Sequence, residues 1–227
     1  MSESVPVIAL DGPGGSGKGT IARRLAHSLG WHLLDSGAIY RVLAHAVVRD
    51  GVDPADEAAV VDLARRIHIR FASGETDSSV FVDGEDVTAA IRTEDCGDTA
   101  SRIAALPAVR EALLQRQRDF RQPPGLVADG RDMGTVVFPD AVVKVFLTAS
   151  VDERARRRYK QLIDQGLGAS LRGLVEEIAA RDRRDASRTV APLAPAEDAV
   201  VLDTTELDVD QAAEAVMSQV RRWQQRR

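Results

Sequence analysis

The segment that most constrains this chain is a glycine-rich loop near its N-terminus. Residues 12–20 read GPGGSGKGT and lie between a short apolar run, residues 5–10, and a helix-like segment, residues 20–29. Strand, glycine-rich loop and helix in this order match the G-x-x-x-x-G-K pattern of a phosphate-binding loop, whose backbone N–H groups surround phosphate oxygens. The loop residues that we expect to bind a nucleoside triphosphate are Gly12, Pro13, Gly14, Gly15, Ser16, Gly17, Lys18, Gly19 and Thr20.

Lys18 and the two residues after it determine how this loop binds phosphate and metal. We expect Lys18 to reach the β- and γ-phosphates as a positive point charge. Serine or threonine usually follows this lysine and binds Mg²⁺, but here Gly19 follows and Thr20 comes next. The sequence therefore leaves direct metal binding by the loop open and assigns Thr20 to an α-phosphate.

The apolar pattern predicts an α/β fold. Short apolar runs recur, and each but the last is followed by a helical pattern, which is typical of βαβ units. The expected strands are residues 5–10, 31–34, 126–128, 141–147 and 199–202, and the expected helices include residues 20–29, 38–49, 152–163 and 209–223. We therefore expect one domain, residues 1–227, with a five-stranded parallel sheet and helices on both faces.

One segment breaks this alternation. Residues 68–72 and 80–82 are strand-like and are joined by residues 73–77, and Asp83-Gly84 follows as a hairpin signal. We expect a small antiparallel β insert near residues 62–92.

Arginines gather in the C-terminal half. Residues 154–188 contain nine Arg and one Lys against five acids, although the whole chain has a net charge of −5. Arg154, Arg157 and Arg158 cluster on one predicted helix, and Gly166-Leu167-Gly168 forms a flexible joint. We expect residues 152–188 to form a mobile basic lid that excludes water and neutralises charge during phosphoryl transfer.

Composition excludes several other classes. An apolar content of 44% allows a core, and no run reaches the 18 or so apolar residues of a membrane helix. Net acidity argues against non-specific binding of nucleic acids or anionic membranes. Cys96 is the single cysteine and the four histidines are scattered, so neither a disulfide nor a metal cluster is indicated. We expect a cytoplasmic protein and, since no heptad pattern is present, a monomer.

Two polar clusters follow predicted strands, where ligands bind in open α/β sheets. Ser36 and Arg41 follow the second strand; the alternative is a helix-capping serine with a surface arginine. Asp129, Arg131 and Asp132 follow the third strand, and the alternative is a buried ion pair. An acid in the position of Asp129 is suited to holding water around Mg²⁺.

A third cluster, Arg181, Asp185 and Arg188, has the i, i+4, i+7 spacing of one helix face. Two arginines with an acid between them can hold a phosphate and a ribose hydroxyl. The alternative is a ladder of salt bridges on a solvated face.

Several motifs together resemble the bacterial cytidylate kinases, which are nucleoside monophosphate kinases. They are GPGGSGKGT, LLDSGAIYR, ADGRDMGTVVFPDA, RDRRDASRTVAPL and AEDAVVLDTT, in this order along nearly the whole chain. The resemblance implies transfer of the γ-phosphoryl group of ATP to CMP or dCMP with Mg²⁺, and a monophosphate-binding region at residues 36–92 that includes the β insert.

The resemblance also implies residue roles. It assigns the CMP phosphate to Ser36, Arg41, Arg131 and Arg188, the cytosine to Ser101, Arg110 and Asp132, and the ribose to Arg181 and Asp185. Spacing alone would make Ser101 a helix-start serine and Arg110 a surface arginine. We expect Lys18, Arg131, Arg158 and Arg188 to be catalytic, Arg157 to bind ATP, and Asp129 to hold Mg²⁺ through water.

Two alternatives remain at this stage. The chain could phosphorylate another small acceptor, such as UMP or shikimate. It could instead be a nucleotide-sensing or RNA-binding module that uses the arginine-rich segment; net acidity and the 4% aromatic content argue against this second alternative.

Overall fold

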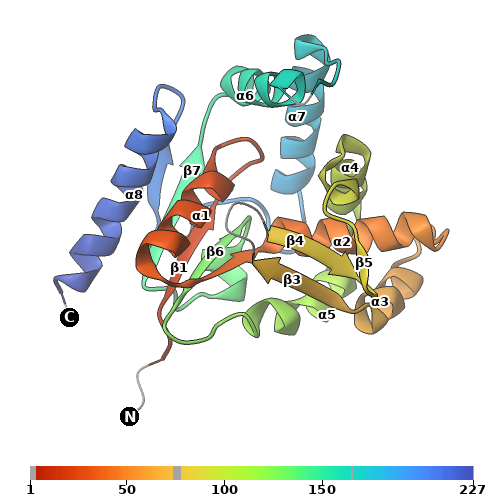
Figure 1. The fold of residues 1–227 in the computed structure, drawn as a ribbon, viewed down its shortest axis with the longest axis horizontal. Helices are drawn as coiled ribbons and strands as arrows, with labels where there is room; N and C mark the ends of the chain where they lie inside the picture. Colours follow the sequence, from red (N-terminus) through yellow and green to blue (C-terminus); the bar gives the residue numbers. More distant parts are fainter. Residues whose placement is uncertain (1–3, 74–77, 165, 227) are drawn as a thin grey trace. The chain divides into compact units, whose positions relative to one another are not determined.

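The structure is a computed structural model that describes residues 4–73, 78–164 and 166–226. The chain divides into two compact units, one made of Met1–Asp35 and Arg118–Arg227 and the other of Ser36–Gln117. Figure 1 shows the elements of both, and each unit is described by itself. The second unit begins at the first residue of the predicted monophosphate-binding region and extends beyond residue 92.

The first unit contains a five-stranded sheet in the order β2-β6-β1-β7-β8. All its pairings are parallel, which confirms the predicted fold class. The strands are β1 (Val7–Asp11), β2 (His32–Asp35), β6 (Leu126–Gly130), β7 (Val143–Thr148) and β8 (Val200–Asp203). Each residue of β1 and β6 is buried, as the apolar pattern predicted for residues 7–10 and 126–128. Both strands run further than predicted, so Asp11 and Asp129 belong to strand ends.

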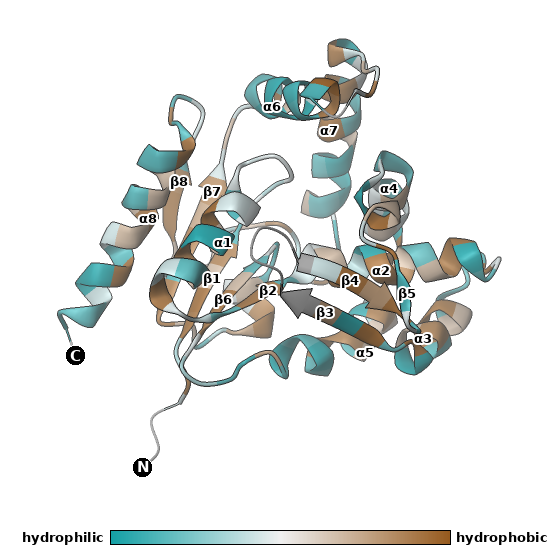
Figure 2. Cartoon of the chain, viewed as in Figure 1, coloured by the Kyte–Doolittle hydropathy of each residue, from teal (hydrophilic) through white to brown (hydrophobic). Residues whose placement is uncertain are grey.

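Helices α1 (Lys18–Leu29) and α8 (Val209–Gln224) pack against this sheet. Ile8 of β1 and Val145 of β7 share one apolar cluster with Leu25 of α1 and Val216 of α8. The hydropathy colours in Figure 2 show the strands as the most apolar part of this unit. A capping box starts α8, since Asp208 accepts from the N–H of Gln211 and the Gln211 side chain accepts from the N–H of Asp208.

Two arginine-rich helices, α6 (Val151–Asp164) and α7 (Leu171–Ala186), pack against each other in the same unit. Ala155, Leu162 and Leu174 form a small apolar cluster of their own. Gly166 has a φ of 74°, which favours glycine, at the predicted joint between the helices. The short π-helix η2 (Met133–Val137) follows β6 and was not predicted.

The second unit combines helices with a small sheet. Its elements are α2 (Ser36–Arg49), α3 (Glu57–Arg66), β3 (Ile69–Ser73), β4 (Ser78–Val82), β5 (Glu85–Asp86), η1 (Ala90–Arg92), α4 (Glu94–Ile103) and α5 (Pro107–Arg118), whose last residue falls in the first unit. Strands β3, β4 and β5 pair antiparallel, which confirms the β insert. The insert begins at Ile69, because residues 62–66 are the end of α3.

The predicted Asp-Gly turn joins β4 to β5. Asp83 and Gly84 both have positive φ, 51° and 91°, as a tight hairpin turn requires. Of the predicted link at residues 73–77, residues 74–77 lie outside the described part of the chain. None of the helices in the described ranges is long and apolar enough to cross a membrane.

Candidate active site

The glycine-rich loop leads from β1 into α1 and holds its own lysine. Lys18 Nζ donates a hydrogen bond to the Pro13 carbonyl oxygen at 2.9 Å, and Ser16 Oγ donates to the same oxygen at 3.0 Å. Lys18 is buried, and burial lowers its pKa from 10.5 to about 7, with the nearby Arg131 charge acting in the same direction. No side chain caps the start of α1.

The backbone of the loop depends on glycine. Gly12 has a φ of 145°, and a Cβ there would lie 2.0 Å from the carbonyl oxygen of Leu147 in β7. Gly15 and Gly17 also have positive φ, 79° and 90°. The loop can therefore turn its backbone toward an anion only because these positions lack side chains.

Asp129 brings a buried carboxylate beside this loop. Its Oδ2 lies 3.1 Å from where a Cβ of Gly19 would be, so a side chain at position 19 would press on it. Its Oδ1 is buried and has no hydrogen-bond partner in the described structure. Burial raises the pKa of Asp129 to about 6, although the positive charge of Lys18 opposes the shift.

This carboxylate fits a magnesium site completed by substrate. The described residues contain no group of three or more His, Cys, Asp or Glu side chains able to hold a metal. Mg²⁺ is commonly bound by one or two carboxylates together with substrate phosphates and water, so a buried carboxylate oxygen without a partner suits it.

Arg131, Asp185 and Arg188 form a cluster in the first unit, around the buried carboxylate of Asp185. Arg131 Nε donates to Asp185 Oδ2 at 3.3 Å, and Arg188 Nη2 donates to Asp185 Oδ1. Burial would raise the pKa of Asp185, but the arginine charges prevail and hold it below its ordinary value. The side chains of Asp185 and Arg188 are 2% and 4% exposed, which contradicts the alternative of a solvated ladder. Arg188 lies beyond the end of α7, so the prediction of one continuous helix face is wrong for it.

The predicted lid arginines are held by protein groups. Arg154 is buried, and its Nη1 donates to the Gly14 carbonyl oxygen at 3.1 Å and to Asp182 Oδ1 at 3.0 Å. Arg158 Nη1 donates to Gln161 Oε1 at 2.8 Å. Arg154 thus connects α6 directly to the glycine-rich loop.

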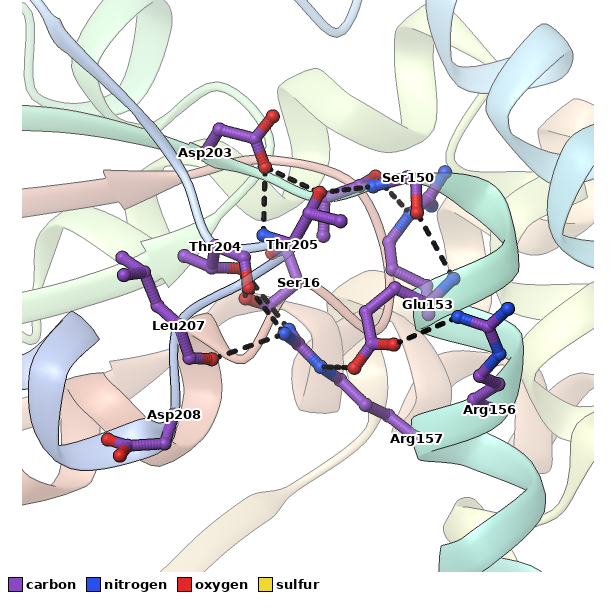
Figure 3. A network of polar contacts seen from close by, with 12 residues as sticks. Ser16, Ser150, Glu153, Arg156, Arg157, Asp203, Thr204, Thr205, Leu207 and Asp208 are labelled. Atoms are coloured by element: carbon purple, nitrogen blue, oxygen red, sulfur yellow. Dashed lines mark hydrogen bonds and ion pairs between the residues drawn. The ribbon is translucent and has the colours of Figure 1, made fainter.

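Arg157 belongs to a network centred on Thr204 (Figure 3). Its Nη1 donates to Thr204 Oγ1 at 3.2 Å, and its Nε donates to Glu153 Oε1 at 3.0 Å. Thr204 is buried, and its hydroxyl lies 3.1 Å from the carbonyl oxygens of both Ser16 and Thr148. Sequence reasoning missed Thr204, although a polar residue directly after a strand was the available signal.

In the second unit, Ser36 and Arg41 lie on α2. Ser36 is buried, and its Oγ donates to Gln117 Oε1 at 2.7 Å. Arg41 Nη1 donates to the carbonyl oxygens of Ile91 at 2.8 Å and Thr93 at 3.0 Å. Neutral oxygen atoms thus accept these hydrogen bonds from Ser36 and Arg41.

Ser101 and Arg110 are buried in the same unit. Ser101 lies on α4 near its C-terminal end, and Arg110 on α5 donates to the Ala104 carbonyl oxygen at 3.3 Å. The Arg110 guanidinium also lies 5.9 Å from the ring centre of Tyr40. The alternatives that spacing alone suggested, a helix-start serine at Ser101 and a surface arginine at Arg110, are therefore wrong. Asp132, also buried, follows β6 in the first unit.

Comparison with known proteins finds a matching family model and several similar proteins. Residues 8–222 match the family model described as "Cytidylate kinase". A cytidylate kinase of Klebsiella pneumoniae (strain 342) is 55% identical over 221 residues, 97% of each chain. A cytidylate kinase of Pseudomonas aeruginosa (strain UCBPP-PA14) is 56% identical over 219 residues, 96% of each chain. A cytidylate kinase of Aeromonas salmonicida (strain A449) is 56% identical over 218 residues, 96% of this chain and 95% of that one.

Proposed function

The chain belongs to the cytidylate kinase family, and from that premise we propose that it transfers the γ-phosphoryl group of ATP to CMP or dCMP, giving ADP and CDP or dCDP. The observation that carries this conclusion is the 55–56% identity to cytidylate kinases over nearly the full length of both chains.

ATP binds at the glycine-rich loop. The backbone N–H groups of residues 12–20 and the ammonium group of Lys18 hold the phosphates, and Thr20 contacts the α-phosphate. We assign Arg157 to the nucleotide and Asp129 to Mg²⁺, through water. When bound, the metal neutralises charge on the β- and γ-phosphates. The buried Oδ1 of Asp129, which lacks a partner, supports this assignment.

We assign the CMP phosphate to Ser36, Arg41, Arg131 and Arg188. Arginines align its oxygens for in-line attack and offset charge on the transferring group, with Lys18 and Arg158 contributing. Phosphate oxygens are already nucleophilic, so no strong general base is needed. The Arg131–Asp185–Arg188 cluster supports this role, because the buried carboxylate of Asp185 orders both guanidinium groups.

Base and sugar are recognised by complementary polar groups. Asp132 accepts from the N4 amino group of cytosine, while Arg110 and Ser101 donate to N3 and O2; Arg181 and Asp185 bind the ribose. Uracil reverses the pattern at positions 3 and 4 and would leave buried groups unpaired. Such mismatches can be rejected by as much as about 10⁴-fold. The burial of Ser101, Arg110 and Asp132 supports this assignment.

We also propose that the protein is a cytoplasmic monomer that acts on small nucleotides rather than on nucleic acid or membranes. The thiol of Cys96 is free and donates a hydrogen bond to the Arg41 carbonyl oxygen, which suits a reducing compartment.

An acceptor panel tests the proposed function. ADP release is measured with ATP and Mg²⁺ against CMP, dCMP, UMP, AMP and shikimate, with Lys18→Ala as the control. We expect turnover with CMP and dCMP that the control lacks. Turnover with another acceptor alone would overturn the base assignment. ATP binding without any acceptor-dependent turnover would favour a nucleotide-sensing module.

A further inference from the structure

Asp11 is a buried acid to which the proposed mechanism gives no role. It is the last residue of β1, and its side chain accepts two backbone hydrogen bonds. The Met133 N–H donates to Oδ1 at 2.7 Å, and the Gly134 N–H donates to Oδ2 at 2.8 Å. Both carboxylate oxygens of Asp11 thus accept hydrogen bonds from the start of η2. Oδ1 of Asp129, in contrast, has no partner in the described structure.

These bonds fix the peptide group that follows Asp132. The N–H of that peptide belongs to Met133 and donates to Asp11. Its carbonyl belongs to Asp132 and accepts from the N–H groups of Val136 at 2.9 Å and Val137 at 3.1 Å. Since a peptide group is planar, holding both its ends sets the backbone angle ψ of Asp132 and thereby the direction in which its side chain leaves the backbone.

We propose that Asp11 is a positioning residue for nucleoside selectivity, which acts through Asp132 by holding the Asp132–Met133 peptide. This inference rests on the proposed function, in which Asp132 reads the cytosine amino group. It gives the end of β1 a role in reading the base as well as in leading to the glycine-rich loop. A purely structural role for Asp11 would change stability alone, and a role in the loop would change the KM for ATP.

The variant Asp11→Asn separates these roles. The amide oxygen can still accept one N–H, but its NH₂ group would face the other N–H, so one bond is lost at nearly constant volume. We expect the selectivity for CMP over UMP, as a ratio of kcat/KM values, to fall about tenfold, as for loss of one hydrogen bond to a charged group. The change should appear chiefly as a higher KM for CMP, with the KM for ATP within about twofold of wild type.

The matched control is Asp140→Asn, which changes an exposed acid paired with Arg121 and should alter none of these values. Unchanged selectivity in folded Asp11→Asn would overturn the inference, as would a rise in the KM for ATP alone. If Asp11→Asn does not fold, Asp11→Ser tests the same contact, because its shorter side chain carries no charge and cannot reach both N–H groups. A lower CMP preference in that variant would support the inference, and an unchanged one would contradict it.

Asp132→Ala distinguishes failure of the inference from failure of the proposed function. If this variant keeps full CMP preference, Asp132 does not read the base and the assignment beneath the inference fails. If it loses the preference while Asp11→Asn keeps it, the base assignment stands and Asp11 has no positioning role.

Discussion

Lys18 Nζ donates a 2.9 Å hydrogen bond to the carbonyl oxygen of Pro13, five residues earlier in the same loop. Its own loop thus holds the lysine that we assign to the ATP phosphates, but in a buried position. Burial, followed by the charge of Arg131, lowers its pKa to about 7. The folded protein therefore disfavours the charged form that phosphate binding requires, and phosphate would restore it.

The lowered pKa of Lys18 predicts that the stability of the protein depends on pH. Unfolded Lys18 keeps its proton up to its ordinary pKa of 10.5, whereas the folded form releases it near 7. Between these values the unfolded state binds more protons, so the free energy of unfolding should rise with pH above about 7. Lys18→Met should lack this rise and have no kinase activity. Urea unfolding at pH values from 6.5 to 9.5 measures how the free energy of unfolding changes with pH. Exposed Lys160→Met should behave as wild type, and a rise that survives in Lys18→Met would contradict the account.

Gly12→Ala should disrupt the loop. The new Cβ would meet the Leu147 carbonyl oxygen at 2.0 Å, and the φ of 145° disfavours any side chain. We expect a loss of about 3 kcal/mol or more in the free energy of unfolding. The control is Gly168→Ala, where a Cβ meets nothing within 4 Å and φ is not positive. Equal urea midpoints for the two variants would show that the close approach to β7 is unimportant.

Gly97→Ala should weaken CMP binding through Arg41. A Cβ at position 97 would lie 2.7 Å from Arg41 Nη2, so the flexible guanidinium must move away from the Ile91 and Thr93 carbonyl oxygens. We expect the KM for CMP to rise about tenfold, as for loss of one charge-assisted contact, with an unchanged KM for ATP. In an Arg41→Ala background the same substitution should add nothing. Additive effects in this double-mutant cycle would rule out a path through Arg41.

Asp185→Asn should damage both stability and turnover. It removes the buried charge that faces Arg131 and Arg188, and breaking a buried ion pair costs about 3 kcal/mol. The two guanidinium groups also lose the acceptor that orients them, so kcat/KM for CMP should fall. Glu176→Gln, which breaks the exposed pair with Arg172, should change stability by less than about 0.5 kcal/mol. Similar unfolding curves for the two variants would refute a buried role for Asp185.

The sequence predicted what depends on local pattern. Fully apolar runs identified the central strands β1 and β6, and Asp83-Gly84 identified a hairpin turn, because both signals lie within a few adjacent residues. The π-helix η2 escaped prediction because its first N–H groups bond to Asp11, 122 and 123 residues earlier in the chain. The end of α7 before Arg188 was missed because residue spacing alone does not show where a helix ends.

The residues of the candidate site likewise include some that the local sequence pattern predicts and some that it does not. The glycine-rich loop and Lys18 followed from spacing, since a strand, loop and helix are contiguous. Ser101 and Arg110 came only from the family resemblance, because residue spacing does not show that they are buried. Thr204 and Asp11 were missed because their partners, Ser16 and Met133, are distant in sequence.

The most direct test of the central claim follows the transferred phosphoryl group itself. The protein is incubated with ATP labelled in the γ-phosphate, Mg²⁺ and CMP or dCMP, and the nucleotides are separated. The account predicts that the label appears in the β-phosphate of CDP or dCDP, in amounts equal to the ADP formed, and that Lys18→Ala forms none. Label released only as inorganic phosphate, or retained in ATP while the protein binds it, would contradict a cytidylate kinase activity.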